Sequence, residues 1–166
     1  MRRDQILFLV KFFAILILSY LFIAWNPIND HVIVPFTEAI TGVATGTLNL
    51  MGQHVVRSGT TIASPRFSVN VNNGCNGVEA MLILLASVAA FPASWRARAT
   101  GLVLGALAVQ LLNEVRIVSL WLLGAYQPRL FQLFHTAVWQ IVIILVAIVF
   151  FLQWSSRIAP RLASRS

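Results

Sequence analysis

Four long apolar stretches dominate this chain and limit what it can fold into. They cover approximately residues 6–25, 76–91, 99–123 and 134–154. A helix needs about 20 apolar residues to cross the hydrocarbon core of a bilayer, where its backbone must satisfy its own hydrogen bonds. Hydrophobic residues make up 58% of the chain and charged residues 10%, whereas a soluble domain averages about 25% charged residues. The sequence therefore predicts an all-α integral membrane protein, a small bundle of about four transmembrane helices.

The first stretch, residues 6–25, has Lys11 as its one charged residue. A cleaved signal peptide is the alternative interpretation. No small-residue cleavage site follows Trp25, however, and the stretch is long for the apolar part of such a peptide. We therefore expect a retained membrane anchor. In the third stretch, Gly101 and Gly105 have the spacing that lets two helices approach closely.

The basic residues are distributed unevenly around these stretches. The short loop between the second and third stretches carries Arg96 and Arg98, and short basic loops stay in the cytoplasm. With that loop inside, both termini are inside, and the whole net charge of +7 falls on the cytoplasmic side. We therefore predict an N-in/C-in orientation, contact with membrane lipid, and no nucleic acid as a partner. The basic residues assigned to the cytoplasm are Arg2, Arg3, Lys11, Arg96, Arg98, Arg157, Arg161 and Arg165.

Residues 26–75 form the outer segment between the first two stretches. Apolar residues at helical spacing after Pro35 predict a helix over residues 32–52, and the polar residues between them make it amphipathic. We interpret it as an interfacial helix on the outer face, with partial embedding in the membrane as the alternative. After the turn signal Ser64-Pro65, apolar and polar residues alternate over 67–72 and predict a small β-hairpin.

Three chemically reactive residues lie at the predicted outer ends of these helices. Cys75 begins the second stretch, Arg116 lies near the end of the third, and His135 begins the fourth. Each alone has an ordinary interpretation, as a buried cysteine, an arginine that reaches the headgroups, or an interfacial histidine. The ends of neighbouring helices in a small bundle lie close together, so we expect the three side chains at one face and one depth.

The surroundings of these residues favour nucleophilic acyl transfer. The turn at 72–77, N-N-G-C-N-G, puts the thiol at a helix N-terminus, where the dipole and free N–H groups lower a thiol pKa. Cys75 would attack a peptide carbonyl, His135 would take the thiol proton and return it to the leaving amine, and Arg116 would stabilise the oxyanion. The single cysteine excludes an internal disulfide, and no metal-ligand or cofactor motif is present, so neither a metal nor a cofactor is expected.

Two further residues lie near this group in the sequence. Asn113 precedes Arg116 by three positions and so shares its helix face. Glu79 follows Cys75 by one helical turn, and it either orients His135 or pairs with Arg116. We favour the second interpretation, in which Glu79 is a structural ion-pair partner.

Three short motifs resemble the exosortase/archaeosortase family. They are N-G-C-N-G-V-E at 73–79, N-E-V-R-I at 113–117 and F-H at 134–135, in this order and each beside an apolar stretch. The N-G-C-N-G-V-E-A form is most similar to the exosortase H branch. The resemblance covers roughly residues 75–154. Asn76-Gly77 stands where the usual motif is nearer C-S-G, a difference that bears on substrate choice.

The resemblance implies a multi-pass protein of the cell inner membrane and a single exosortase-like domain over residues 1–166. Its activity would be that of a cysteine transpeptidase or protease, with the active site on the periplasmic side. Through a Cys75 thioester it would cleave the C-terminal sorting signals of exported PEP-CTERM-like proteins, which consist of a short motif, a transmembrane helix and a basic cluster. Its catalytic residues fall on Cys75, Arg116 and His135, and the supporting residues would be Asn113, Asn76, Glu79 and Gly77. The alternative is a non-enzymatic small membrane subunit whose polar face binds a partner helix or lipid.

Overall fold

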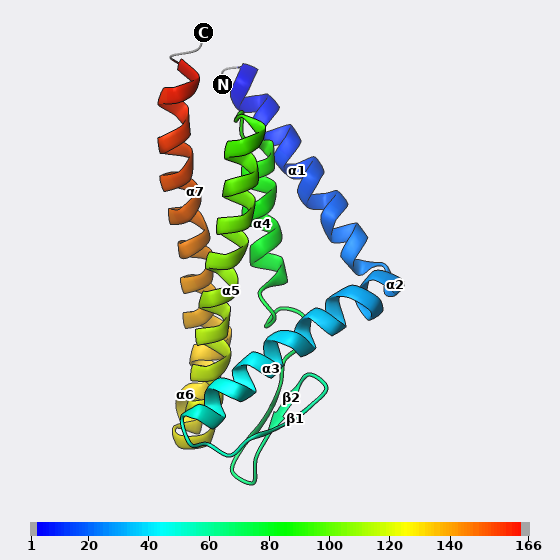
Figure 1. The fold of residues 1–166 in the computed structure, drawn as a ribbon, viewed down its shortest axis with the longest axis vertical. Coiled ribbons are helices and arrows are strands. Elements are labelled where there is room, and N and C mark those ends of the chain that lie inside the picture. Colours follow the sequence, from blue (N-terminus) through cyan, green and yellow to red (C-terminus); the bar gives the residue numbers. More distant parts are fainter. Residues whose placement is uncertain (1–2, 164–166) are drawn as a thin grey trace.

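Long helices give the molecule its shape, as Figure 1 shows. The computed structural model describes residues 3–163, with side chains up to residue 158. Arg2 and Arg165, which the orientation prediction uses, lie outside the described residues, and so does the side chain of Arg161. The long helices are α1 (Arg3–Ala24), α5 (Trp95–Tyr126) and α7 (Trp139–Ala163), and the shorter helix α4 (Val78–Ala90) lies among them. Both termini lie at the same end of the molecule (Figure 1), and the predicted all-α membrane class is confirmed.

Within the described residues, three helical segments are long and apolar enough to cross a membrane: α1, α5 and the segment Pro128–Ile158. The last consists of α6 (Pro128–Leu133), the π-helical turn η2 (Phe134–Val138) and most of α7. The expected second span, residues 76–91, is instead the 13-residue helix α4, about 20 Å long and shorter than a hydrocarbon core of about 30 Å. The helix cannot extend backwards because Gly77 has φ +77°. Consequently α4 begins partway along α5 and leaves a polar turn beside it (Figure 1).

The short helix α4 is the centre of the bundle, because α1, α5 and α7 all pack against it. Leu84 and Val88 of α4 form a buried cluster with Val109 of α5 and Ala147 of α7. Gly101 and Gly105 of α5 allow the close approach that their spacing predicts. Gly101 faces Val88 and Trp154, and Gly105 faces Leu84 and Phe150.

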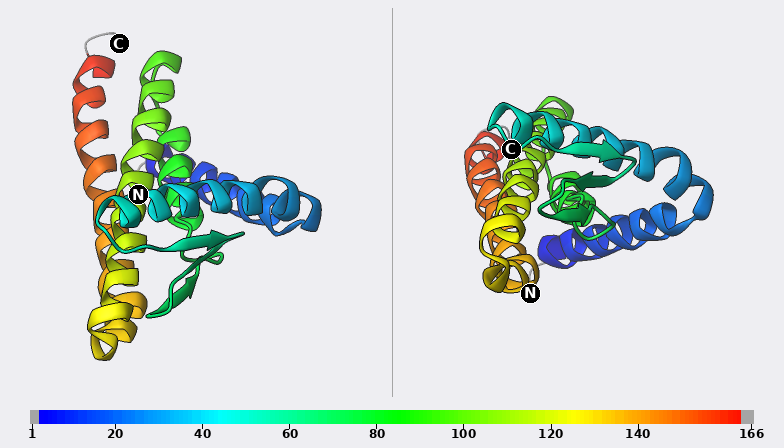
Figure 2. Two further views of the ribbon diagram at one scale, coloured as in Figure 1. Left: turned by 60° about the horizontal axis from the view of Figure 1, so that its bottom comes forward. Right: turned by 90° about the horizontal axis from the view of Figure 1, so that it is seen from below.

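The outer segment contains the predicted helix. After α2 (Asn26–Ile28) and the π-helical turn η1 (Asn29–Ile33), α3 (Val34–Leu50) crosses α5 obliquely, as Figure 2 shows. The side chains of Thr37 and Thr41 in this helix are buried, and each hydroxyl donates a hydrogen bond to the carbonyl four residues earlier. The buried face of α3 carries Thr37 and Thr41 together with the apolar residues Ala44 and Leu48, while Val43 and Leu50 are exposed.

A small antiparallel sheet follows α3, with strand order β1-β2-β3. The strands are β1 (Val56–Ser58), β2 (Thr61–Ala63) and β3 (Ser68–Asn70). The predicted hairpin is β2–β3, with Ile62 opposite Val69, and β1 adds a strand that the sequence analysis did not predict. Ile62 and Trp121 belong to one buried cluster, so the sheet is fixed against α5.

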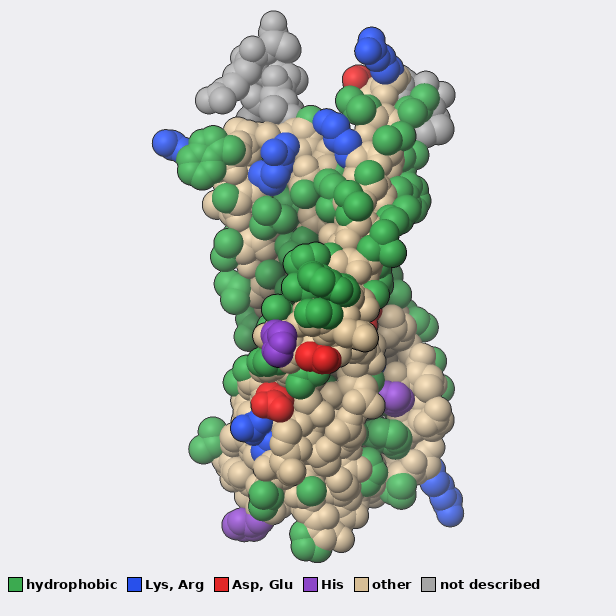
Figure 3. Space-filling view, turned by 90° about the vertical axis from the view of Figure 1, so that its right-hand side faces the viewer, with side chains coloured by type: hydrophobic (Ala, Val, Ile, Leu, Met, Phe, Trp, Pro, Cys, Tyr) green, Lys and Arg blue, Asp and Glu red, His purple; other side chains and the backbone are tan. Residues whose placement is uncertain are grey.

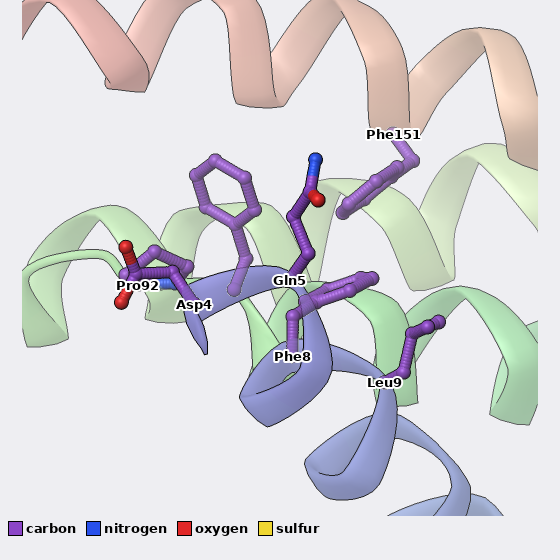
Figure 4. A pocket seen from close by; sticks show the side chains of 7 residues that line it. Asp4, Gln5, Phe8, Leu9, Pro92 and Phe151 are labelled. Atoms are coloured by element: carbon purple, nitrogen blue, oxygen red, sulfur yellow. The ribbon is translucent and has the colours of Figure 1, made fainter. Parts of the chain in front are cut away.

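Aromatic side chains pack together at the end of the molecule that carries both termini. A cavity of about 550 Å³ lies there between α1, α7 and the residues that follow α4 (Figure 4). Phe8 of α1 stacks on Phe151 and meets the edge of Phe91. Lys and Arg side chains gather at this same end, above a mainly hydrophobic surface (Figure 3). The cavity therefore lies at the far end of α4 from Cys75. It is lined by Asp4, Gln5, Phe8, Leu9, Phe91, Pro92 and Phe151.

The packing of Gly101 gives a stability prediction. A Cβ atom there would lie 2.6 Å from the Trp154 ring and 2.9 Å from Val88, so Gly101→Val should lower the free energy of unfolding by about 1–3 kcal/mol. Thermal unfolding in detergent measures the change. Gly46→Ala in α3 is the matched control, because nothing lies within 4 Å of its Cβ position and alanine favours a helix. Equal losses in both variants would contradict the packing described here.

Candidate active site

Cys75 lies in a glycine-punctuated turn, residues 71–77, between β3 and α4. Its own N–H donates to the Asn72 carbonyl over 2.9 Å, which closes the turn. Gly74 and Gly77 have φ of +86° and +77°, a conformation that side chains other than glycine adopt with difficulty. The glycines of the motif are thus a backbone requirement of the turn that presents the thiol.

Asn76 fastens this turn to the rest of the protein. Its side chain is fully buried, and its amide nitrogen donates to the hydroxyl of Thr37 over 3.0 Å and to Asn73 over 3.2 Å. Its amide oxygen accepts from the N–H of Val78 over 3.1 Å. Asn76 therefore connects α3, the turn and the start of α4.

Two charged side chains hold the peptide groups of Gly74. The Gly74 N–H donates to Glu79 Oε1 over 2.8 Å, and the Gly74 carbonyl accepts from Arg116 Nη1 over 3.2 Å. In the described part of the chain the ion pair formed is Arg57–Glu38, so the expected ion pair of Glu79 with Arg116 is wrong. The two residues act on one backbone unit instead of on each other.

The structure brings the three predicted site residues into contact. Cys75 Sγ lies 3.0 Å from His135 Nε2, and Arg116 Nη2 donates to Sγ over 3.6 Å. Arg116 is 3% exposed and lies well inside α5, not near its outer end as expected. It meets the thiol there because α4 starts late and the turn reaches the middle of α5.

The thiol of Cys75 is harder to ionise than the sequence suggested. Burial raises the pKa of Cys75, the positive charge of Arg116 opposes that rise, and the negative charge of Glu79 adds to it. The expected lowering of the Cys75 pKa is wrong, because burial raises this pKa by more than the charge of Arg116 lowers it. Cys75 therefore depends on a neighbouring base for its ionisation.

Other residues at the site carry weaker sequence signals. Asn113 is fully buried against Gly77, and neither polar atom of its amide has a hydrogen-bond partner among the described residues. Gln110 donates to the Asn76 carbonyl over 3.3 Å. Its spacing of three from Asn113 places it on the same face of α5, a signal that could have identified it. Thr37 had no such signal, because its contact with Asn76 joins distant parts of the sequence.

The chemistry available here is that of a nucleophile, a base and a cation in contact. In the described part of the chain, no group of three or more His, Cys, Asp or Glu side chains could hold a metal ion. A thiol beside an imidazole, with a guanidinium at the sulfur, fits acyl transfer through a covalent intermediate.

The comparisons with known proteins agree with this chemistry. The model of the transmembrane exosortase (EpsH) family matches residues 4–153. A comparison with curated proteins gave no match, and a comparison with solved structures gave none either. Such family members act on C-terminal sorting signals of their substrates in general. The match spans most of a multi-pass membrane chain. The chain therefore belongs to the transmembrane exosortase family, which at the family level implies a membrane cysteine peptidase or transpeptidase.

Proposed function

We propose that this protein cleaves the C-terminal sorting signals of exported PEP-CTERM-like proteins, with Cys75 as the nucleophile. The observation that carries the proposal is the 3.0 Å contact between Cys75 Sγ and His135 Nε2. Such a distance is within the reach of direct proton transfer from a nucleophile to its base. The substrate would be a short motif, a transmembrane helix and a basic cluster, and a cysteine in a turn beside long apolar helices suits a peptide bond next to a membrane helix.

The reaction would proceed in two balanced halves. His135 takes the thiol proton while Cys75 Sγ attacks the carbonyl carbon, which gives a tetrahedral oxyanion. The C–N bond then breaks, the proton passes from His135 to the leaving amine, and a thioester remains. In the second half an amine or water attacks the thioester carbon while His135 takes its proton. The C–S bond then breaks, the new amide or acid leaves, and the proton passes from His135 to sulfur to regenerate the thiol. An amine acceptor gives transpeptidation, and water gives hydrolysis.

Arg116 is the group proposed to stabilise the oxyanion. Its Nη2 already lies 3.6 Å from Sγ, so a donor is present beside the atom to which the new carbon bonds. Its Nη1 is occupied by the Gly74 carbonyl, which fixes the plane of the guanidinium. Arg116→Lys should therefore be damaging, because one ammonium cannot bind the carbonyl and the oxyanion in the same planar geometry.

We further propose that the termini and the α4–α5 loop face the cytoplasm and that the site faces the periplasm of an inner membrane. The observations that support this are the shared end of both termini and the Lys and Arg side chains gathered there (Figures 1 and 3), which the positive-inside rule assigns to the cytoplasm.

Cysteine labelling tests this orientation. In a Cys75→Ala background, a cysteine introduced by Ser58→Cys in the exposed strand β1 should react with a membrane-impermeant maleimide in intact cells. A cysteine introduced by Ser94→Cys in the exposed α4–α5 loop should react after lysis alone. The reverse pattern would show the opposite orientation.

Substitution of the nucleophile tests the enzymatic proposal. Cys75→Ala and His135→Gln should each lower the processing of a co-expressed substrate by about 10³-fold or more, while the protein still inserts into the membrane. Thr136→Ala is the matched control, because Thr136 neighbours His135 and is exposed. Processing that survives in Cys75→Ala would favour the alternative, a non-enzymatic subunit that binds a partner helix or lipid.

The pH dependence of Cys75 alkylation tests the electrostatics of the site. Since the pKa of Cys75 is raised, alkylation by iodoacetamide in detergent should reach half its maximal rate above the pH of an ordinary cysteine, about 8.5. Arg116→Gln removes the charge that lowers this pKa, so the midpoint should move up. Glu79→Gln removes a charge that raises it, so the midpoint should move down. A midpoint below that of an ordinary cysteine would refute the sign of the shift.

A further inference from the structure

We propose that Phe131 and Phe67 are positioning residues for His135, and that Gly124 provides the space that sets their place. The inference rests on the proposed function, because it concerns the orientation of the proposed base. It identifies a stack of aromatic side chains, which we call the aromatic brace, made of Phe67, Phe131 and the imidazole of His135.

The three rings of the aromatic brace contact one another in sequence, from the His135 imidazole through Phe131 to Phe67. The rings of Phe131 and His135 are stacked, with centroids 5.5 Å apart and planes 9° from parallel. Phe131 belongs to α6 and His135 to the π-helical turn η2, and they lie four residues apart on adjoining turns. Phe67 then meets Phe131 edge to face, with centroids 5.4 Å apart and planes at 64°. Each ring therefore restricts the tilt of the next one.

The far end of the brace is fixed to α5 and to the sheet. A Cβ atom at Gly124 would lie 2.2 Å from two ring atoms of Phe67, so the ring occupies the space that any other residue would fill. The backbone of Phe67 is held in the β2–β3 turn, where its carbonyl accepts from the Ser64 N–H over 3.0 Å. Phe67 thus has little freedom either at its ring or at its backbone.

His135 needs such a brace because its hydrogen bonds do not determine its orientation. In catalytic groups of this type the base is usually oriented by a third residue that binds its other ring nitrogen. Among the described residues, the hydrogen-bond partner of His135 is Cys75, through Nε2. The parallel face of Phe131 limits the rotation of the imidazole, and in this site it takes the place of the third residue.

The first test changes the ring that touches the imidazole. Phe131→Leu should lower kcat for substrate processing by about 10–100-fold, since a misplacement of about 1 Å costs up to about 10²-fold, while KM stays within about 2-fold. Phe131→Tyr keeps the stacking face and should restore kcat. Leu133→Ala is the control for loss of an apolar side chain from α6, because Leu133 is 54% exposed. An unchanged kcat in Phe131→Leu, or a loss that tyrosine does not restore, would overturn the proposal.

The second test uses the contact between Phe67 and Gly124. Gly124→Ala should lower kcat because the new methyl group displaces the Phe67 ring. In a Phe67→Ala background that ring is gone, so adding Gly124→Ala should lower kcat by less than about 2-fold. Such non-additivity is expected of residues in contact. If Gly124→Ala lowers kcat by the same factor with Phe67 present and with Phe67 replaced by alanine, Gly124 does not act through Phe67 and the proposal is wrong.

A spectroscopic measurement separates this inference from the proposed function. The ¹⁵N shifts of the His135 imidazole report its hydrogen bond to Cys75, and they should change in Phe131→Leu but not in Phe131→Tyr or Leu133→Ala. Processing that persists in Cys75→Ala would refute the proposed function whatever these shifts do. Shifts that are the same in Phe131→Leu as in the unchanged protein would refute the brace, even where Cys75→Ala abolishes processing.

Discussion

The backbone of Gly74 is the point on which the candidate site depends. Glu79 accepts its N–H and Arg116 donates to its carbonyl, so two charges of opposite sign fix one segment of chain next to Cys75. Neither charge is neutralised by direct pairing with the other. A buried guanidinium is costly without hydrogen bonds. Here the carbonyl and the sulfur accept from Nη1 and Nη2, while Nε is buried without a partner among the described residues. The interactions that make Arg116 tolerable inside the bundle are therefore the same ones that place it at the thiol.

The short length of α4 makes room for this arrangement. A full-length second span would have put apolar helix against the middle of α5, where Gln110, Asn113 and Arg116 share one face. Because α4 begins at Val78, the polar turn lies there instead and Gln110 and Arg116 donate to its carbonyls. The polar side chains of α5 thereby face the protein interior, which is where such residues are tolerated in a membrane protein.

The sequence predicted best those features that follow from a periodic pattern of apolar residues or from the order of helices along the chain. Apolar length predicted the long helices, and the alternation after Ser64-Pro65 predicted the β2–β3 hairpin. The expectation that three helix ends lie close together predicted the proximity of Cys75, Arg116 and His135, although Arg116 lies inside α5 and not at its end. Contacts between distant segments carried no such signal. The Asn76–Thr37 hydrogen bond and the packing of Phe67 into Gly124 depend on how α3, the sheet and α5 meet, and no local pattern specifies that.

The raised pKa of the Cys75 thiol is consistent with its partial burial. A resting thiolate would need a permanent charge to be held in a partly buried place, and burial raises the pKa of this thiol instead. The negative charge would then form only as the thiol attacks, first on sulfur and next on the carbonyl oxygen. Arg116 is already fixed beside the sulfur by its bond to Gly74, so little reorganisation is needed when that charge develops. In the proposed reaction, a preorganised cation beside an uncharged thiol would let the negative charge develop where it is stabilised, without a resting thiolate–guanidinium pair.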